Sequence, residues 1–84
     1  MKKLQKFIKA ENDWRKLFGN RELSIDTPEG RQQIAELIDI QLSPENLYCD
    51  GEISHTEAQM KYRMLSGAAK DLMKIDPNVV IYEI

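Results

Sequence analysis

Residues that could bind a metal ion or attack a substrate are scarce in this sequence. Its 84 residues include one cysteine, Cys49, and one histidine, His55. A single cysteine excludes a disulfide within the chain and suits a reducing cytoplasm. The sequence has no glycine-rich phosphate loop, and a serine or cysteine nucleophile would lack an evident base. We therefore expect a protein that is not an enzyme and that binds no cofactor or metal ion.

The sequence also lacks a long hydrophobic run. The apolar pair at residues 7–8 is soon followed by Lys9 and Glu11, so we expect neither a signal peptide nor a membrane-spanning segment. Hydrophobic residues make up 42% and charged residues 31% of the chain, which is typical of a folded globular protein rather than a disordered one. A chain this short forms one modest core. The expectation is a single small helical domain over residues 1–84, located in the cytoplasm.

Positive charge is concentrated near the N-terminus. Residues 1–20 hold six basic and two acidic side chains, and the remaining residues hold six basic and twelve acidic ones. A basic helix can meet phosphate groups or an acidic protein surface. The whole chain is nevertheless acidic, with a pI near 5.3, whereas nucleic-acid-binding domains are usually basic. We therefore favour a solvated helix face for the N-terminal charges.

The first of three predicted helices spans about residues 2–18 and ends at Gly19, which can adopt a C-cap conformation. Glu11 lies in the middle of its apolar face. Either the helix kinks near Glu11, or the carboxylate points into an interface; a kink, or a carboxylate at the edge of a small core, is favoured, and a buried one would need a cationic or hydrogen-bonding partner. The expected core-facing stripe of this helix consists of Leu4, Phe7, Ile8, Trp14, Leu17 and Phe18.

The second predicted helix has a clear start. Thr27 is a good N-cap and Pro28 suits the first helical position, so we expect a helix from Pro28 to about Leu42. A single helical turn should follow at residues 43–45, and the polar segment 20–26 is expected to be a surface loop.

The third predicted helix spans about residues 55–75, because Pro77 prevents further extension. It carries two apolar stripes, so we expect it to be covered on two sides. The small residues at 66–69 predict a close packing crossover, or alternatively the axis of a homodimer. One stripe consists of Ala58, Tyr62, Leu65, Ala69 and Leu72, and the other of Met60, Met64, Ala68 and Ile75.

The segment from Asp50 to Glu57 fits two interpretations. Asp50-Gly51 favours a tight turn, and Ser54 can cap the third helix with Glu57 completing a capping box. We prefer this interpretation. The alternative is a degenerate EF-hand loop, which fails at Tyr48, where a calcium ligand belongs. Its ligands would be Asn46, Asp50, Ser54 and Glu57.

The C-terminal residues 78–84 are mostly apolar and β-branched. They predict a short strand or a docked extended tail. A strand would join a minimal hairpin around Asp50-Gly51 or pair with another chain. The predicted fold class is therefore mainly α: a small three-helix domain with a short β-turn or hairpin element and a C-terminal strand-like tail.

The favoured function is a cytosolic protein-interaction module that regulates or inhibits a larger protein, a format common among small accessory proteins of bacteria and their phages. Self-association as a homodimer is also expected, because short chains often gain stability from copies of themselves. The expected contact residues are Met60, Met64, Ile75, Val80 and Tyr82. The alternative is a site for an anionic ligand, either nucleic acid or a nucleotide, built from Lys2, Lys3, Lys6, Lys9, Lys61, Tyr62 and Arg63. A further alternative is the degenerate calcium loop.

Overall fold

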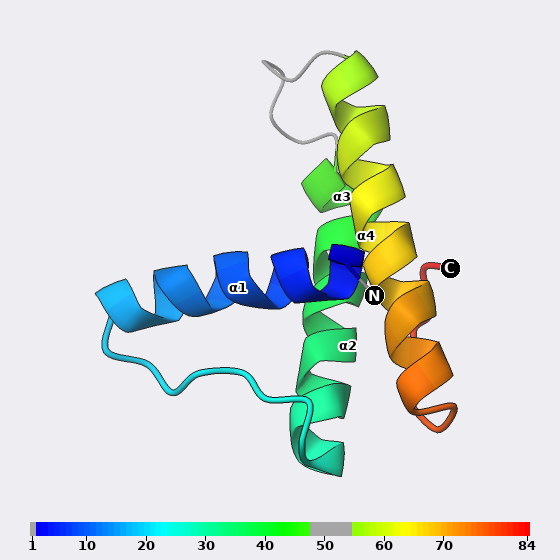
Figure 1. Ribbon diagram of the computed structural model, residues 1–84. Helices are drawn as coiled ribbons and strands as arrows, with labels where there is room; N and C mark the ends of the chain where they lie inside the picture. The colour runs from blue at the N-terminus through cyan, green and yellow to red at the C-terminus, as the bar shows by residue number, and fades with distance from the viewer. Residues whose placement is uncertain (1, 48–54) are drawn as a thin grey trace.

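The computed structural model describes residues 2–47 and 55–84, which form four helices and no strand. These are α1 (Lys2–Leu17), α2 (Pro28–Leu42), α3 (Pro44–Leu47) and α4 (His55–Ile75). Helices α2 and α4 run side by side, and α1 crosses in front of them with its C-terminal end projecting from the body (Figure 1). The prediction of a mainly α fold is confirmed. None of the described helices is long and apolar enough to cross a membrane.

The helix ends follow the local sequence signals. The Thr27 side chain accepts a hydrogen bond of 3.0 Å from the Gly30 amide, and Pro28 begins α2. At the end of α1, Gly19 has a φ of 69°, and the next amide, that of Asn20, donates to the Arg15 carbonyl at 2.8 Å. This is the pattern of a Schellman motif, which requires a left-handed residue at the position of Gly19. The predicted helices and their ends are confirmed to within a residue or two.

The core lies where α1 and α2 cover two sides of α4. Leu4 and Phe7 of α1 are almost fully buried, and Ile8 packs against the same cluster. Burying a side chain of this size contributes about 1.5–3 kcal/mol, so these contacts hold the first half of α1 to the body. The other buried members of the cluster are Leu23, Ile34, Ala35, Ile38, Leu42, Leu65, Ala68, Ala69, Leu72 and Val79.

The small residues of α4 mark the place where α1 crosses it. A Cβ atom at Gly67 would meet the aliphatic stem of Lys3, and the adjacent Ala68 and Ala69 are fully buried. The small side chains of Ala68 and Ala69 keep α4 narrow at this crossing, whereas Gly67 meets only a flexible side chain of α1. The interpretation of residues 66–69 as a packing crossover is confirmed within the chain itself.

Glu11 and Asn12 of α1 form hydrogen bonds with α2 and with the loop that follows α1. Glu11 is half-buried, and its Oε1 accepts a 2.8 Å hydrogen bond from Nε2 of Gln41. Because α1 is one continuous helix through Glu11, the structure matches the second of the two favoured expectations, a carboxylate at the edge of the core. Asn12 accepts from the Leu23 amide at 2.7 Å and donates to the Leu23 carbonyl at 3.2 Å. This pair of bonds draws Leu23 into the core, so the segment 20–26 is not wholly the surface loop that its polarity predicted.

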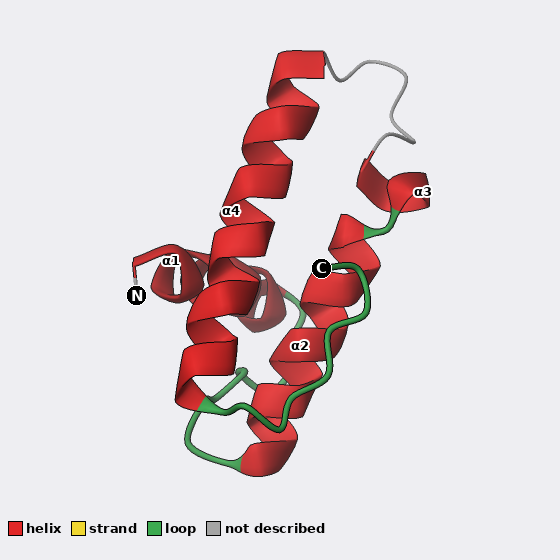
Figure 2. Ribbon diagram, turned by 90° about the vertical axis from the view of Figure 1, so that its right-hand side faces the viewer, coloured by secondary structure: helices red, strands yellow, loops and turns green. Residues whose placement is uncertain are grey.

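The C-terminal tail corrects the expectation of a strand. Residues 79–81 follow α2 in an extended path and lead into a turn at Tyr82 and Glu83, and no strand forms in this segment (Figure 2). The Val80 amide donates to Oε1 of Gln32 at 3.4 Å, and the Glu83 amide donates to Oδ1 of Asp39 at 3.0 Å. Val79 is buried and Ile81 is half-buried, so alternate side chains pack on a helix while polar side chains satisfy the backbone. The proposed hairpin partner, residues 48–53, lies outside the described residues.

Arg31 joins three segments that are far apart in the sequence. Its Nε donates to Oδ2 of Asp76 at 2.7 Å, and its Nη1 donates to the Ile25 carbonyl at 2.8 Å. Oδ1 of Asp76 accepts from the Asn78 amide at 3.0 Å. The hydrogen bond from Arg31, followed by that from Asn78, lowers the pKa of Asp76 below its usual value. Arg31 therefore links the start of α2 to the loop before it and to the end of α4.

The lowered pKa of Asp76 predicts a stability that depends on pH. A carboxyl group with a lower pKa in the folded state stabilises the fold above its unfolded pKa, near 4, and loses that effect as the pH falls through its folded pKa. We expect Asp76→Asn to be less stable than the parent at pH 7, with a difference that shrinks below about pH 4. Urea unfolding of the parent and the variant, at pH 7 and below about pH 4, measures this difference in stability. A difference that stays constant with pH would contradict the role of the ionised carboxylate.

Two glycines provide a matched test of packing. A Cβ atom at buried Gly30 would collide with the backbone carbonyl of Ser24, whereas one at Gly67 would meet only the flexible side chain of Lys3. We expect Gly30→Ala to lower the free energy of unfolding by about 1–3 kcal/mol. Gly67→Ala should be neutral or stabilise by up to about 1 kcal/mol, because alanine favours helices. If both substitutions change the free energy of unfolding in urea by the same amount, the contact of Gly30 with the Ser24 carbonyl does not limit the side chain at that position.

Candidate functional site

The residues that could support metal or catalytic chemistry do not assemble in the described part of the chain. Across residues 2–47 and 55–84, no three His, Cys, Asp or Glu side chains gather into a group that could hold a metal ion. His55 is exposed at the start of α4, where its Nε2 lies 3.1 Å from Nε2 of Gln59. These two residues line an open hollow together with Tyr62 and Arg63.

The degenerate calcium loop is only partly within the described residues. Asn46 lies in the short helix α3, where its Nδ2 donates to the Ile40 carbonyl at 2.6 Å and to Oγ of Ser43 at 3.0 Å. Glu57 lies in the first turn of α4. Asp50 and Ser54, the other two ligands of that interpretation, lie outside the described residues, and so does the Asp50-Gly51 turn.

The second half of α1 and the residue that follows it carry three large exposed apolar side chains. Trp14 is 60% exposed, Leu17 77% and Phe18 69%. The expectation that these residues face the core is wrong, because α1 extends beyond α2 and α4 and only its first half meets them (Figure 1). The described residues therefore include an apolar, partly aromatic surface at the projecting end of a helix.

The projecting end of α1 is held in place by its own contacts. The rings of Trp14 and Phe18 stack with centroids 5.9 Å apart and an interplanar angle of 7°. Arg15 donates to the Arg21 carbonyl at 3.0 Å, and Lys16 lies 3.2 Å from Glu22. With the Asn12 bonds to Leu23, these contacts tie the returning loop to the helix, so the aromatic pair is presented on a fixed support.

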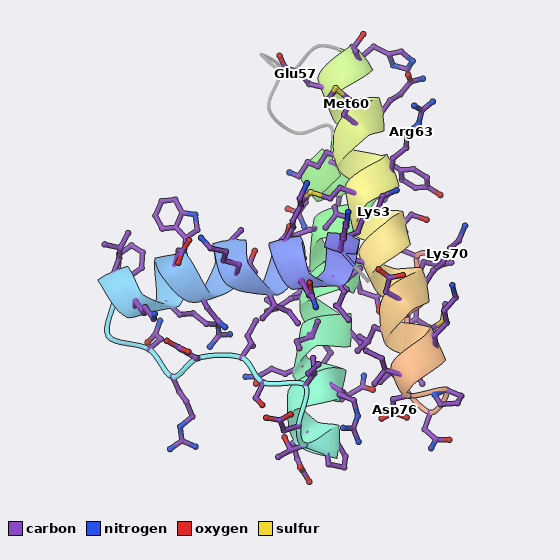
Figure 3. All side chains as sticks on the ribbon, viewed as in Figure 1. Lys3, Glu57, Met60, Arg63, Lys70 and Asp76 are labelled. Carbon is purple, nitrogen blue, oxygen red and sulfur yellow. The ribbon has the colours of Figure 1, made fainter. Side chains whose placement is uncertain are left out.

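Two methionines of α4 lie on the side from which α1 projects. Met60 is 64% exposed and Met64 is 37% exposed. Met60 precedes Gly67 by seven residues, about two helical turns, and therefore shares its face of α4. Figure 3 shows Met60 on the upper part of α4, above the place where Lys3 lies against that helix.

The exposed apolar side chains of α1 and of the upper part of α4 lie on the sides of these helices that face each other. Trp14 follows Lys3 by eleven residues, about three turns, so it lies on the same side of α1 as the side chain that touches Gly67. The angle between α1 and the upper part of α4 thus has apolar side chains on both of its sides. We call this surface the apolar corner, and it consists of Trp14, Leu17, Phe18, Met60 and Met64.

The other predicted contact residues are exposed but lie elsewhere. Ile75 is at the end of α4, and Val80 and Tyr82 are in the tail; they are 38%, 45% and 83% exposed. The tail runs along α2 on the side facing the viewer in Figure 2, whereas α1 extends behind the body in that view. The structure therefore separates Val80 and Tyr82 from the apolar corner and places Ile75 at the far end of α4, beyond the crossing with α1.

The residues of the predicted anionic-ligand site are also divided. Lys2, Lys3, Lys6 and Lys9 are all exposed along α1, and Lys9 forms an ion pair with Asp13 at 3.4 Å. On α4, Lys61 is half-buried, whereas Tyr62 and Arg63 are exposed beside the hollow at His55. Arg63 lies one turn before Gly67, the residue against which Lys3 lies. The lysines farther along α1 extend away from that point.

Comparison of this chain with protein-family models, with curated proteins and with solved structures finds no match.

Proposed function

We propose that this protein is a protein-interaction module that binds a larger protein through the apolar corner and regulates or inhibits it, without catalysing a reaction. The observation that carries the proposal is the exposure of Trp14, Leu17 and Phe18 on a helix whose first half builds the core. Large exposed apolar groups that gather on one surface are typical of contact sites between proteins.

The chemistry of the corner suits a protein contact. Tryptophan is enriched among the residues that dominate binding energy at interfaces. The stacked pair of Trp14 and Phe18 is already ordered, so less side-chain entropy is lost when a partner covers it. Met60 and Met64 have flexible side chains that adapt to an irregular surface. A partner that inserts an apolar segment between α1 and α4 would contact all four side chains.

The proposal is tested by capturing partners from the native host. The parent protein, a Trp14→Ala/Phe18→Ala double variant and a Tyr82→Ala control are immobilised, and bound proteins are identified by mass spectrometry. We expect a partner that is retained by the parent and the control but lost by the double variant, because truncating an interface anchor costs about 2 kcal/mol or more. Capture that is equal in all three, or absent in the parent, would contradict the proposal.

An anionic ligand is a second candidate, favoured by the unpaired charges of α1. Lys2, Lys3 and Lys6 are exposed and form no ion pair within residues 2–47 and 55–84. Phosphate groups bind such side chains in a manner that weakens steeply with added salt. The acidic character of the whole chain opposes this function.

Neutralising the lysines separates the two candidates. We expect replacement of Lys2, Lys6 and Lys9 by glutamine to leave the melting temperature nearly unchanged, because an exposed pair such as Lys9–Asp13 contributes less than about 1 kcal/mol. We also expect the parent to show no binding to a single-stranded oligonucleotide at physiological salt in a fluorescence anisotropy titration. If the parent binds, and the triple variant does not, the anionic-ligand function would replace our first proposal.

A further inference from the structure

We propose that a second copy of this chain fills the apolar corner, so that α1 of each protomer lies in the corner of the other about a two-fold axis. This inference rests on the proposed function, because it takes the corner to be a protein-binding surface. It names the occupant of that surface when no other partner is present.

The shape of the chain permits a reciprocal contact. Helix α1 leaves the middle of α4 at a wide angle and its C-terminal end projects from the body (Figure 1), while Met60 lies on α4 above that crossing (Figure 3). When two α1 helices lie antiparallel about an axis at Ala10, Leu17 of one copy lies opposite Lys3 of the other, beside α4, and Trp14 lies opposite Lys6. A two-fold axis then repeats the same contact in reverse.

A small residue lies at the centre of the pairing surface. Ala10 is exposed and follows Lys3 by seven residues, so it shares the face of α1 that carries Trp14. Its small side chain permits close approach of the two antiparallel helices at the two-fold axis. Larger apolar side chains then lie on either side of this point, at Trp14 and Leu17 of each copy.

The exposed area is sufficient for a specific dimer. The exposed fractions of the five corner residues correspond to roughly 600 Å² of surface per copy, given that a large aromatic side chain buries 150–250 Å². Two copies that cover each other's corners would bury about 1,200 Å², which is the lower end of the range for specific protein–protein interfaces.

The charges of α1 allow this approach. Lys9 precedes Trp14 by five residues and Lys16 follows it by two, so both lie more than a quarter turn from it, on the other side of the helix. Lys3 and Lys6 lie within a quarter turn of Trp14, so their aliphatic stems border the shared surface, whereas the charges of Lys9 and Lys16 point away from it.

The experiment combines sedimentation equilibrium with fluorescence, from micromolar to millimolar concentration. Trp14 is the single tryptophan of the chain, so its emission reports directly on the corner. We expect a monomer–dimer equilibrium, with an emission maximum that moves to shorter wavelength as dimer forms. Leu17→Lys and Met64→Lys should each weaken dimerisation by roughly tenfold or more. The matched control Tyr82→Lys, on the opposite side, should leave it unchanged.

Several results would overturn the inference. A parent that stays monomeric up to millimolar concentration would do so, and so would a dimer that tolerates both lysine variants or shows no shift in Trp14 emission. The fluorescence measurement uses the parent protein, so it does not depend on whether a variant folds. For each lysine variant, far-UV circular dichroism establishes whether the chain is still helical. If the parent is monomeric but still captures a partner through Trp14 and Phe18, the dimer is refuted and the proposed function stands. If the parent neither dimerises nor captures a partner, both proposals are refuted.

Discussion

The crossing of α1 over the middle of α4 determines how the rest of the chain is arranged. Lys3 lies against Gly67, with Ala68 and Ala69 buried beside it, so the N-terminal end of α1 is fixed at the middle of α4. From that point a straight helix of 16 residues is longer than the width of the two helices beneath it. Its second half must therefore extend beyond the core, and the apolar residues of that half remain exposed.

The features predicted well from the sequence are those set by neighbouring residues. Thr27 caps α2 and Gly19 ends α1 through bonds within a few positions of the chain, so their side chains and backbone preferences are sufficient to identify them. The burial of Trp14 was predicted wrongly for a different reason. Helical spacing shows which residues share a face, but the end of the neighbouring helices decides how much of that face is covered. Glu11, the half-buried carboxylate, marks the approximate limit of that cover.

The loop and the tail show a second limit of local signals. Leu23 is buried because the side chain of Asn12, eleven residues earlier, satisfies both of its backbone groups. The tail has the composition of a strand, yet its amides bond to Gln32 and Asp39 of a helix. In both cases an apolar segment is positioned by polar side chains that are distant in sequence. Composition predicts that such a segment is extended or buried, but not which residues will pair with it.

The division of α1 into a covered half and a projecting half has a consequence for how the protein can change over generations. Leu4 and Phe7 contribute to folding, whereas Trp14 and Leu17 contribute little to it because solvent surrounds most of their surface. Substitutions in the last turns of the helix can then change the exposed surface at little cost in stability. Surface chemistry and folding stability therefore depend on separate parts of one helix, so the projecting half can vary in sequence while the core stays the same.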